Sequence, residues 1–237
     1  MTSKPRPSLG ILALEYGGSP IEFPPDPRPG SLFNPATFDF PLILETAAGA
    51  WADRVISGDP LLESAYVAAA RRLVDRGAIA IVGDCGFTIR YQAAIAAAVD
   101  VPVAMSSLLL VPMLLRQLPP KGKLAILTAD STNCSEDLFG VDDPAQRARV
   151  VIGGVEGGVM WQNATKRPYK NTSVPEIEAD VATCVTRLRN AHPDIAAILF
   201  ECTGFPMVTP AIRRLTGLPI YDTATVFRMT FESVDNG

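Results

Sequence analysis

Residues 79–87 read IAIVGDCGF, and residues 196–204 read AAILFECTG. When the two segments are superposed, Cys85 falls on Cys202 at an offset of 117 positions, and an acidic residue precedes each cysteine. The same offset places Pro102 on Pro219 without a gap. Each copy therefore has the order apolar strand, acid, cysteine, glycine-containing turn, helix, proline and next strand. This repeat predicts two similar α/β lobes, each with a cysteine at the carboxyl end of a strand.

Short apolar runs alternate with amphipathic stretches along the chain. The runs with the composition of buried strands are 11–14, 41–44, 79–82, 124–127, 150–152 and 195–200. Helical periodicity is clearest at 61–75 and 174–190. Because this alternation is typical of βαβ units, we expect an α/β protein of two Rossmann-like lobes with mostly parallel sheets. The repeat predicts that the lobes are related by pseudo-twofold symmetry, with the active site in the cleft between them.

Proline and glycine positions suggest where the lobes meet. Residues 119–122 read PPKG, a sequence typical of a hinge. We expect a first lobe of residues 1–118 together with 208–237, and a second lobe of residues 119–207. Long loops at 20–35, rich in proline, and at 160–174, rich in polar residues, are candidates for lids over a site.

The composition narrows the class of protein. Hydrophobic residues make up 48% of the 237 residues and charged residues 19%, which is typical of a globular chain with a large core. A net charge of −4 with dispersed Lys and Arg argues against a nucleic-acid partner. The longest apolar run, 108–115, is far shorter than the roughly 20 residues that span a bilayer, and residues 9–14 read as a strand rather than a secretion signal. We expect a cytoplasmic protein with a small-molecule substrate and no membrane association, and the apolar content is compatible with a homodimer or higher homo-oligomer.

The four cysteines are widely spaced and form no CxxC pair, so the sequence predicts neither a disulfide framework nor a structural zinc site. Cys184 shares one helical apolar stripe with Ile177, Val181, Val185 and Leu188, and is expected in the core. We expect Cys134 to have a loop or packing role. A single histidine, His192, next to Pro193, is expected at the surface and weakens any metal-hydrolase or Ser-His-Asp interpretation.

The position of Cys85 and Cys202 favours chemistry. Ligands of open parallel sheets bind beyond the carboxyl ends of the strands, and a cysteine at the start of the following helix has a lowered thiol pKa. Two such thiols on opposite sides of one ligand can remove a proton from one face of a carbon and deliver it to the other. Hydrogen-bond donors would stabilise the developing enolate, so we expect no metal and no cofactor.

Several neighbouring residues have two interpretations. Asp84 and Glu201 could tune the thiols or relay protons, or they could bond to turn amides and helix ends. Thr203 is a candidate donor to a substrate carboxylate or enolate. A carboxylate clamp could come from Arg90, Lys166, Arg167 or Lys170, although isolated basic side chains are usually solvated.

These residues resemble the aspartate/glutamate/hydantoin racemase superfamily over nearly the whole chain. The second family motif, Gly-Cys-Thr-His or Gly-Cys-Ala-Gly, is similar to the segment Glu201-Cys202-Thr203-Gly204. The first motif, typically Cys-Asn-Thr, corresponds to Cys85-Gly86-Phe87-Thr88, so the usual asparagine and threonine are replaced here.

The resemblance implies a cofactor-independent isomerase in which Cys85 and Cys202 are the catalytic proton-transfer pair. The residues that it implies around the substrate are Tyr16, Gly17, Gly18, Gly86, Phe87, Thr88, Thr128, Ser131, Thr203 and Gly204. The expected reaction is racemisation or epimerisation at a carbon next to the carbonyl of a carboxylic acid, amino acid or hydantoin-like compound. The superfamily also contains arylmalonate decarboxylases and maleate cis–trans isomerases, which are alternatives. A non-catalytic two-lobed binding protein is an alternative of another class.

Overall fold

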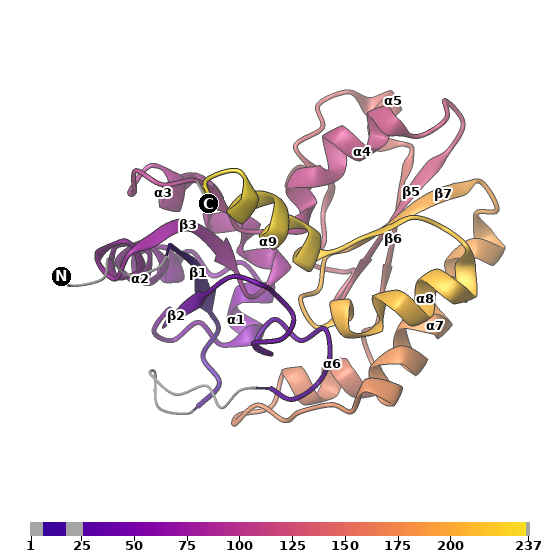
Figure 1. Ribbon diagram of the computed structural model, residues 1–237. Helices are drawn as coiled ribbons and strands as arrows, with labels where there is room; N and C mark the ends of the chain where they lie inside the picture. The colour runs from indigo at the N-terminus through magenta and orange to yellow at the C-terminus, as the bar shows by residue number, and fades with distance from the viewer. Residues whose placement is uncertain (1–6, 18–25, 236–237) are drawn as a thin grey trace. The chain divides into compact units, whose positions relative to one another are not determined.

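The computed structural model describes residues 7–17 and 26–235, which form two compact units (Figure 1). One unit is Met1–Ser106 with Ala224–Gly237, and the other is Ser107–Thr223. These bounds differ from the predicted lobes, because residues 107–118 and 208–223 pack within the second unit. Strand β8 (Ile220–Tyr221) pairs in parallel with β7 (Ile195–Phe200), which fixes the later segment there.

The predicted hinge at residues 119–122 is a turn inside the second unit. The Gly122 amide donates to the Pro119 carbonyl at 2.8 Å, and the turn leads directly into strand β5 (Lys123–Thr128). The division between the units falls instead at Ser106 and Ser107 and again at Thr223 and Ala224. A proline-rich turn therefore marked a tight connection rather than a domain boundary.

The first unit contains a parallel sheet with the strand order β2-β1-β3-β4. Its strands are β1 (Ser8–Ala13), β2 (Leu42–Thr46), β3 (Ala78–Gly83) and β4 (Val103–Ala104). Its helices are α1 (Ala52–Ile56), α2 (Glu63–Asp75), α3 (Gln92–Ala96), α9 (Thr223–Glu232, from Ala224 onward) and the 3-10 helices η1 (Pro60–Leu62) and η2 (Gly86–Tyr91). The predicted loop at 20–35 lies partly outside the described residues.

The second unit repeats this plan with the order β6-β5-β7-β8, again all parallel. Strand β6 spans Val150–Gly154. The α-helices are α4 (Val111–Gln117), α5 (Pro144–Arg147), α6 (Val159–Ala164), α7 (Val174–Ala191) and α8 (Thr209–Thr216). The 3-10 helices are η3 (Ser107–Leu110), η4 (Glu136–Phe139) and η5 (Phe205–Val208). The predicted loop at 160–174 is helical in its first part, because α6 extends to Ala164.

The duplication extends to the register of the strands. In the first sheet the pairing of β1 with β3 shifts between Ser8 and Leu9, and in the second sheet the pairing of β5 with β7 shifts between Lys123 and Leu124. Both irregularities lie at the start of the strand that pairs with the one leading to the cysteine. The predicted α/β class with two parallel sheets is confirmed, and the two halves share even this local departure from regular pairing.

In the first unit, alternation along β1 explains how both faces of the sheet are covered. Leu9 and Ile11 point into a core with Phe227 and Phe231 of α9. Gly10 points to the other face, where a Cβ atom would lie 3.0 Å from Leu73 of α2. The glycine therefore allows α2 to pack closely on the sheet.

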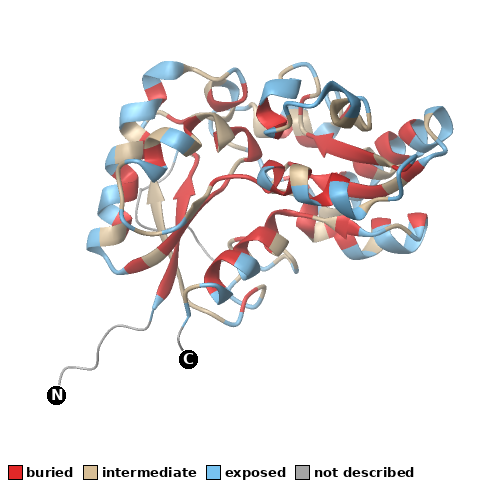
Figure 2. Ribbon diagram, turned by 90° about the horizontal axis from the view of Figure 1, so that it is seen from above, coloured by how far each residue is buried: buried red, intermediate tan, exposed pale blue. Residues whose placement is uncertain are grey.

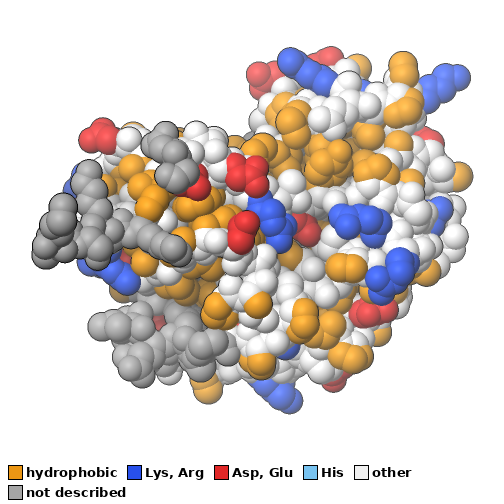
Figure 3. Space-filling model, in the orientation of Figure 1, with side chains coloured by type: hydrophobic (Ala, Val, Ile, Leu, Met, Phe, Trp, Pro, Cys, Tyr) orange, Lys and Arg blue, Asp and Glu red, His pale blue; other side chains and the backbone are white. Residues whose placement is uncertain are grey.

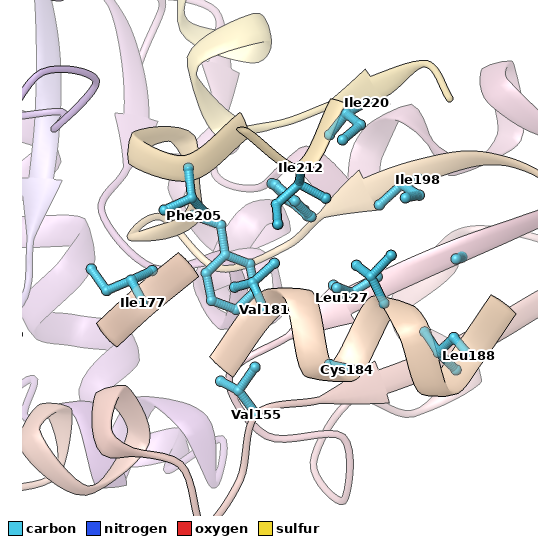
Figure 4. Packing of buried hydrophobic residues seen from close by; sticks show 14 of the residues in the cluster. Leu127, Val155, Ile177, Val181, Cys184, Leu188, Ile198, Phe205, Ile212 and Ile220 are labelled. Atoms are coloured by element: carbon cyan, nitrogen blue, oxygen red, sulfur yellow. The ribbon is translucent and has the colours of Figure 1, made fainter. Parts of the chain in front are cut away.

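In the second unit, α7 packs its apolar stripe against β5 and β6, and the stripe shares one buried cluster with Ile198 and Phe200 of β7 (Figure 4). The buried residues of the helix are those of the predicted stripe: Ile177, Val181, Cys184, Val185 and Leu188. Gly153 of β6 faces this helix, and a Cβ there would lie 2.7 Å from Cys184 Sγ. Cys184 is thus a core residue, and burial raises the pKa of its thiol.

Buried residues follow the strands of each sheet, while exposed residues lie on the outer faces of the helices (Figure 2). On the face shown in Figure 3, Lys and Arg side chains are interspersed with Asp and Glu rather than gathered in a stripe. No helix within residues 7–17 and 26–235 is both long enough and apolar enough to cross a membrane.

Candidate active site

One residue, Asp84, separates Cys85 from the end of β3, and Cys85 begins a tight turn. It is the N-cap of η2, with an extended backbone and no side-chain capping bond. The Thr88 amide donates to the Cys85 carbonyl at 3.0 Å, and the Thr88 hydroxyl lies 2.5 Å from the same oxygen and 2.8 Å from the Met105 carbonyl. These contacts fix the backbone of the turn, and Cys85 itself is half-buried at its start.

Gly83 allows the strand to come this close to the turn. A Cβ atom at this position would lie 2.4 Å from the Thr88 hydroxyl and 2.5 Å from the Met105 carbonyl, which no side chain can occupy without moving the backbone. The glycine before the acid-cysteine pair is therefore required by close approach rather than by a special backbone angle.

Asp84 is buried and bonds to β1 and the residues just beyond it. Its amide donates to the Leu12 carbonyl, while its Oδ2 accepts bonds from the Tyr16 hydroxyl at 2.6 Å and the Leu14 amide at 3.4 Å. Burial raises the pKa of Asp84 to about 7, and the two hydrogen bonds oppose this only in part. Asp84 thus caps no helix, and it titrates near neutral pH beside Cys85.

A pair of tyrosines that the sequence analysis did not identify lies around Cys85. Tyr66 of α2 stacks on Tyr91 of η2 with ring centroids 4.7 Å apart, and the Tyr91 hydroxyl donates to the Asp59 carbonyl at 2.8 Å. Burial and then the charge of Cys85 raise the pKa of Tyr66 well above its usual value. Tyr66 lies far from Cys85 in sequence and neither tyrosine belongs to a motif, so only the packing of α2 on the sheet reveals the pair.

Cys202 occupies the equivalent place in the second unit. Glu201 is buried after β7, its amide donates to the Leu127 carbonyl at 2.8 Å, and its Oε2 accepts a bond from the Thr128 hydroxyl at 2.8 Å. The Phe205 amide closes the turn onto the Cys202 carbonyl at 3.1 Å. Both units therefore place a buried carboxyl group, held by a hydroxyl donor, directly before a half-buried cysteine.

The turn after Cys202 contacts α6. A Cβ at Gly204 would lie 2.3 Å from Met160 Cε and 3.9 Å from Cys202 Sγ. Met160 is therefore a neighbour of the cysteine turn, and its flexible, polarisable side chain gives this side of the turn an apolar wall.

The α-helices that follow the cysteines begin later in the chain than the sequence predicted. Cys85 is followed by the 3-10 helix η2, and Cys202 by a turn and then η5. The first α-helices after them, α3 and α8, begin at Gln92 and Thr209. Short turns therefore stand where we expected the first turn of an α-helix, with its dipole acting directly on each thiol.

The other residues predicted to bind substrate fall into two groups. Thr88 and Thr128 are fully buried with engaged hydroxyls, and Phe87 and Gly86 are buried beside them, so these residues support the two cysteine turns. Ser131 bonds to Glu156 through both its amide and its hydroxyl.

The remaining candidates are more accessible: Tyr16, Thr203 and Gly204 are partly exposed and Gly17 is exposed, while Gly18 lies outside the described residues.

Of the candidate basic clamp, Arg90 lies in η2, which begins at Cys85, and Lys166, Arg167 and Lys170 follow α6. Lys166 Nζ donates to Asn163 Oδ1 within the segment that follows α6, at 3.2 Å. His192 ends α7, and its Nδ1 lies 3.4 Å from Lys123 Nζ. Within the described part of the chain, no three His, Cys, Asp or Glu side chains are grouped in a way that could hold a metal ion.

Solved structures with this fold include a decarboxylase and a racemase. Unliganded arylmalonate decarboxylase aligns with a TM-score of 0.55 at 18% identity, covering 98% of this chain and 94% of that one. Glutamate racemase from Francisella tularensis subsp. tularensis SCHU S4, in complex with D-glutamate, aligns with a TM-score of 0.58 at 14% identity, covering 98% and 84%. The predicted resemblance to the racemase superfamily is therefore confirmed at the level of the fold.

Proteins that are similar to this chain in sequence are named as lyases. A dimethylsulfoniopropionate lyase of Durusdinium sp. clade D is 31% identical over 225 residues, which cover 91% of this chain and 71% of that protein. Dimethylsulfoniopropionate lyase 2 of Emiliania huxleyi is 27% identical, covering 92% and 72%. No protein-family model matches the chain. Since the similarity to the Durusdinium enzyme covers nine-tenths of this chain and more than two thirds of that protein, this chain belongs to the family of the dimethylsulfoniopropionate lyases.

Proposed function

We propose that this chain is a lyase that removes a proton next to the carboxylate of dimethylsulfoniopropionate and releases dimethyl sulfide. The observation that carries the proposal is the pair of half-buried strand-end cysteines, Cys85 and Cys202, each preceded by a buried carboxyl group. The family supports the choice of substrate. Racemisation, which the sequence predicted, is a second candidate.

The chemistry needs a base of the kind that a cysteine provides. A thiolate takes a proton from the carbon next to the carboxylate, and the electron pair of that C–H bond forms a carbon–carbon double bond. The bond from the next carbon to sulfur breaks, and its electrons leave with neutral dimethyl sulfide. Acrylate remains, and the thiol returns its proton to solvent. The proposed step involves Cys85 or Cys202 as the catalytic base.

The leaving group distinguishes this reaction from racemisation. Dimethyl sulfide leaves without a proton, so elimination requires one base and no acid. Racemisation requires a base on one face of the carbon and an acid on the other, because the proton must return from the opposite side. The duplicated cysteines fit either reaction, but the lyase needs only one of them for proton removal.

Accessible side chains in the first unit fit a sulfonium cation. Tyr16, which bonds to Asp84, stacks edge-on with Phe33 at a centroid distance of 6.1 Å, and both rings are partly exposed. Aromatic faces attract cations, and we propose that these two rings bind the dimethylsulfonium group.

The test is direct detection of both products. The purified full chain is incubated with dimethylsulfoniopropionate, dimethyl sulfide is measured in the headspace by gas chromatography, and acrylate is measured by proton NMR. We expect equal amounts of the two products, in excess of a sample treated with iodoacetamide. Absence of dimethyl sulfide at every substrate concentration would rule out the proposal.

Racemisation of a 2-substituted acid is the second candidate, because each half of the duplicated fold carries a cysteine at the same place. In heavy water a racemase would incorporate deuterium next to the carboxylate while optical rotation is lost. A panel of chiral 2-substituted acids, amino acids and hydantoins separates the two activities, since the lyase gives acrylate and the racemase returns its substrate with label.

A further inference from the structure

The Tyr66 hydroxyl is a buried polar group that the proposed reaction does not yet use. The residue is 0% exposed, and no hydrogen-bond partner for its hydroxyl is found among the described residues. A buried hydroxyl without a partner loses its hydration and gains nothing in exchange, so such groups are rare in folded proteins. The position of Tyr66 beside a half-buried cysteine suggests why it is retained.

Tyr66 is held in place from two sides. It lies on α2, which packs against β3, the strand that ends just before Asp84 and Cys85. Its ring stacks on Tyr91 at an interplanar angle of 21°, and Tyr91 ends the same 3-10 helix that Cys85 begins. Tyr66 therefore packs on the element that carries the cysteine, and its ring has little freedom to turn away.

The charged and titratable groups that act on the Tyr66 hydroxyl are Cys85, Tyr91 and Asp84. After burial, the largest influence is the negative charge of Cys85, and all three groups raise the pKa of Tyr66. The hydroxyl therefore keeps its proton throughout the range in which a thiol ionises. It remains available as a donor to a nearby anion.

We propose that Tyr66 is a positioning residue for Cys85, whose thiolate turns to accept a hydrogen bond from the Tyr66 hydroxyl. A hydrogen bond to an ionised acceptor is about twice as strong as one between neutral groups, so this bond forms when the thiol loses its proton. It favours the thiolate over the thiol and holds Sγ in one orientation. The inference rests on the proposed function only in treating Cys85 as a reacting thiol.

The experiment compares Tyr66→Phe with Tyr91→Phe in the full chain. Each variant loses one hydroxyl from the same stacked pair, but the Tyr91 hydroxyl already donates to the Asp59 carbonyl. The rate of alkylation by iodoacetamide is measured from pH 5.5 to 10 and resolved by mass spectrometry of tryptic peptides. Cys85 and Cys202 fall in different peptides, since Arg90 and Arg189 lie between them, so Cys202 is an internal reference.

For Tyr66→Phe we expect the alkylation midpoint of Cys85 to rise by about one pH unit, which is about tenfold less thiolate at a pH below the midpoint. The midpoint of Cys202 stays unchanged, and the melting temperature stays equal or rises because an unpaired buried hydroxyl is gone. For Tyr91→Phe we expect a lower melting temperature and an unchanged Cys85 midpoint.

The inference is overturned if the Cys85 midpoint does not move in Tyr66→Phe, or if Cys202 moves equally. Dimethyl sulfide release is measured in parallel on the unmodified chain. A shifted Cys85 midpoint without any product contradicts the proposed function and leaves the role of Tyr66 intact. Product without a shift contradicts the role of Tyr66 alone.

Discussion

The Tyr16 hydroxyl donates a hydrogen bond of 2.6 Å to Oδ2 of Asp84, the residue directly before Cys85. The second unit has the same relationship with other residues, since the Thr128 hydroxyl donates to Glu201 directly before Cys202. The donors differ in residue type and in position, because Tyr16 lies beyond β1 and Thr128 ends β5. A hydroxyl bonded to a buried acid thus recurs in both halves, and it gives each acid a structural role that can be tested apart from activity.

Asp84→Asn should change how stability depends on pH. Because the pKa of Asp84 rises from 3.8 to about 7 on folding, the folded protein holds a proton that the unfolded chain has released between these values. The stability that this group contributes is therefore lost as pH rises from about 4 to about 7, and the loss stops above that. Asparagine does not titrate. From pH 5 to 7 the free energy of unfolding of the variant should therefore rise, relative to that of the wild type, by about 1.4 kcal/mol per pH unit.

Urea denaturation at half-unit steps from pH 5 to 8 measures this difference. Asp130→Asn is the control: although burial opposes its ionisation, hydrogen bonds from Thr132 and Asn133 hold the pKa of Asp130 below its usual range. The contribution of Asp130 to stability is complete above about pH 4. The difference in the free energy of unfolding between Asp130→Asn and the wild type should therefore be constant over pH 5 to 8. A constant difference for Asp84→Asn as well would show that Asp84 is ionised throughout.

Thr128→Val should destabilise the second unit. The substitution keeps the shape of the side chain but removes the hydroxyl that donates to the buried Glu201 at 2.8 Å. Loss of a bond to a buried acid costs about 1–3 kcal/mol. The measurement is the free energy of unfolding in urea at pH 7. Thr183→Val, on the exposed side of α7 with its hydroxyl bonded to the Ala179 carbonyl, should change it by less than about 0.5 kcal/mol. Equal effects of the two variants would contradict the role of Thr128.

Gly204→Ala should impair the reaction more than the fold. The new Cβ would lie 2.3 Å from Met160 Cε, the end of a flexible side chain that can move, and 3.9 Å from Cys202 Sγ. We expect the melting temperature to fall by only a few degrees. Displacement of Met160 beside the cysteine should lower kcat/KM for dimethyl sulfide release about ten- to a hundredfold. Adding Met160→Ala should restore part of this loss, and a double variant no better than Gly204→Ala would show that the clash is not the cause.

The duplicated segment predicted the fold because its offset of 117 positions covers complete elements. Strand β3 (Ala78–Gly83) shifted by this offset coincides with β7 (Ile195–Phe200), and the two-residue β4 coincides with β8. The stripe of α7 was also predicted residue by residue, since a single apolar face with period 3.6 has one interpretation. The lobe boundaries were not predicted, because a Pro-Gly turn looks the same in a hinge and between a helix and a strand.

The positions of the two cysteines in the fold could be predicted from the sequence, but the side-chain contacts around them could not. Strand ends place Cys85 and Cys202, and the repeat identifies both. The partners of Asp84 and Glu201 come from β1 and β5, far away in sequence, so no spacing indicates Tyr16 or Thr128 as donors. Tyr66 reaches Cys85 only through the packing of α2 on β3, which depends on tertiary structure rather than on local pattern.

Cys85→Ser and Cys202→Ser distinguish the lyase from the racemase. Serine keeps the size of cysteine, but its hydroxyl pKa is too high for it to serve as a base near neutral pH. For elimination one thiolate suffices, because dimethyl sulfide leaves unprotonated, so one variant should lose about a thousandfold in kcat while the other keeps a measurable fraction. A racemase would lose activity equally in both serine variants, since each direction of racemisation needs a base and an acid. Headspace gas chromatography of dimethyl sulfide and deuterium incorporation measure the two reactions separately.

Cys184→Ala is the control, because it removes a buried thiol from the core under α7. This variant should have a lower free energy of unfolding and an unchanged kcat. Full lyase activity in both serine variants would contradict catalysis by either cysteine.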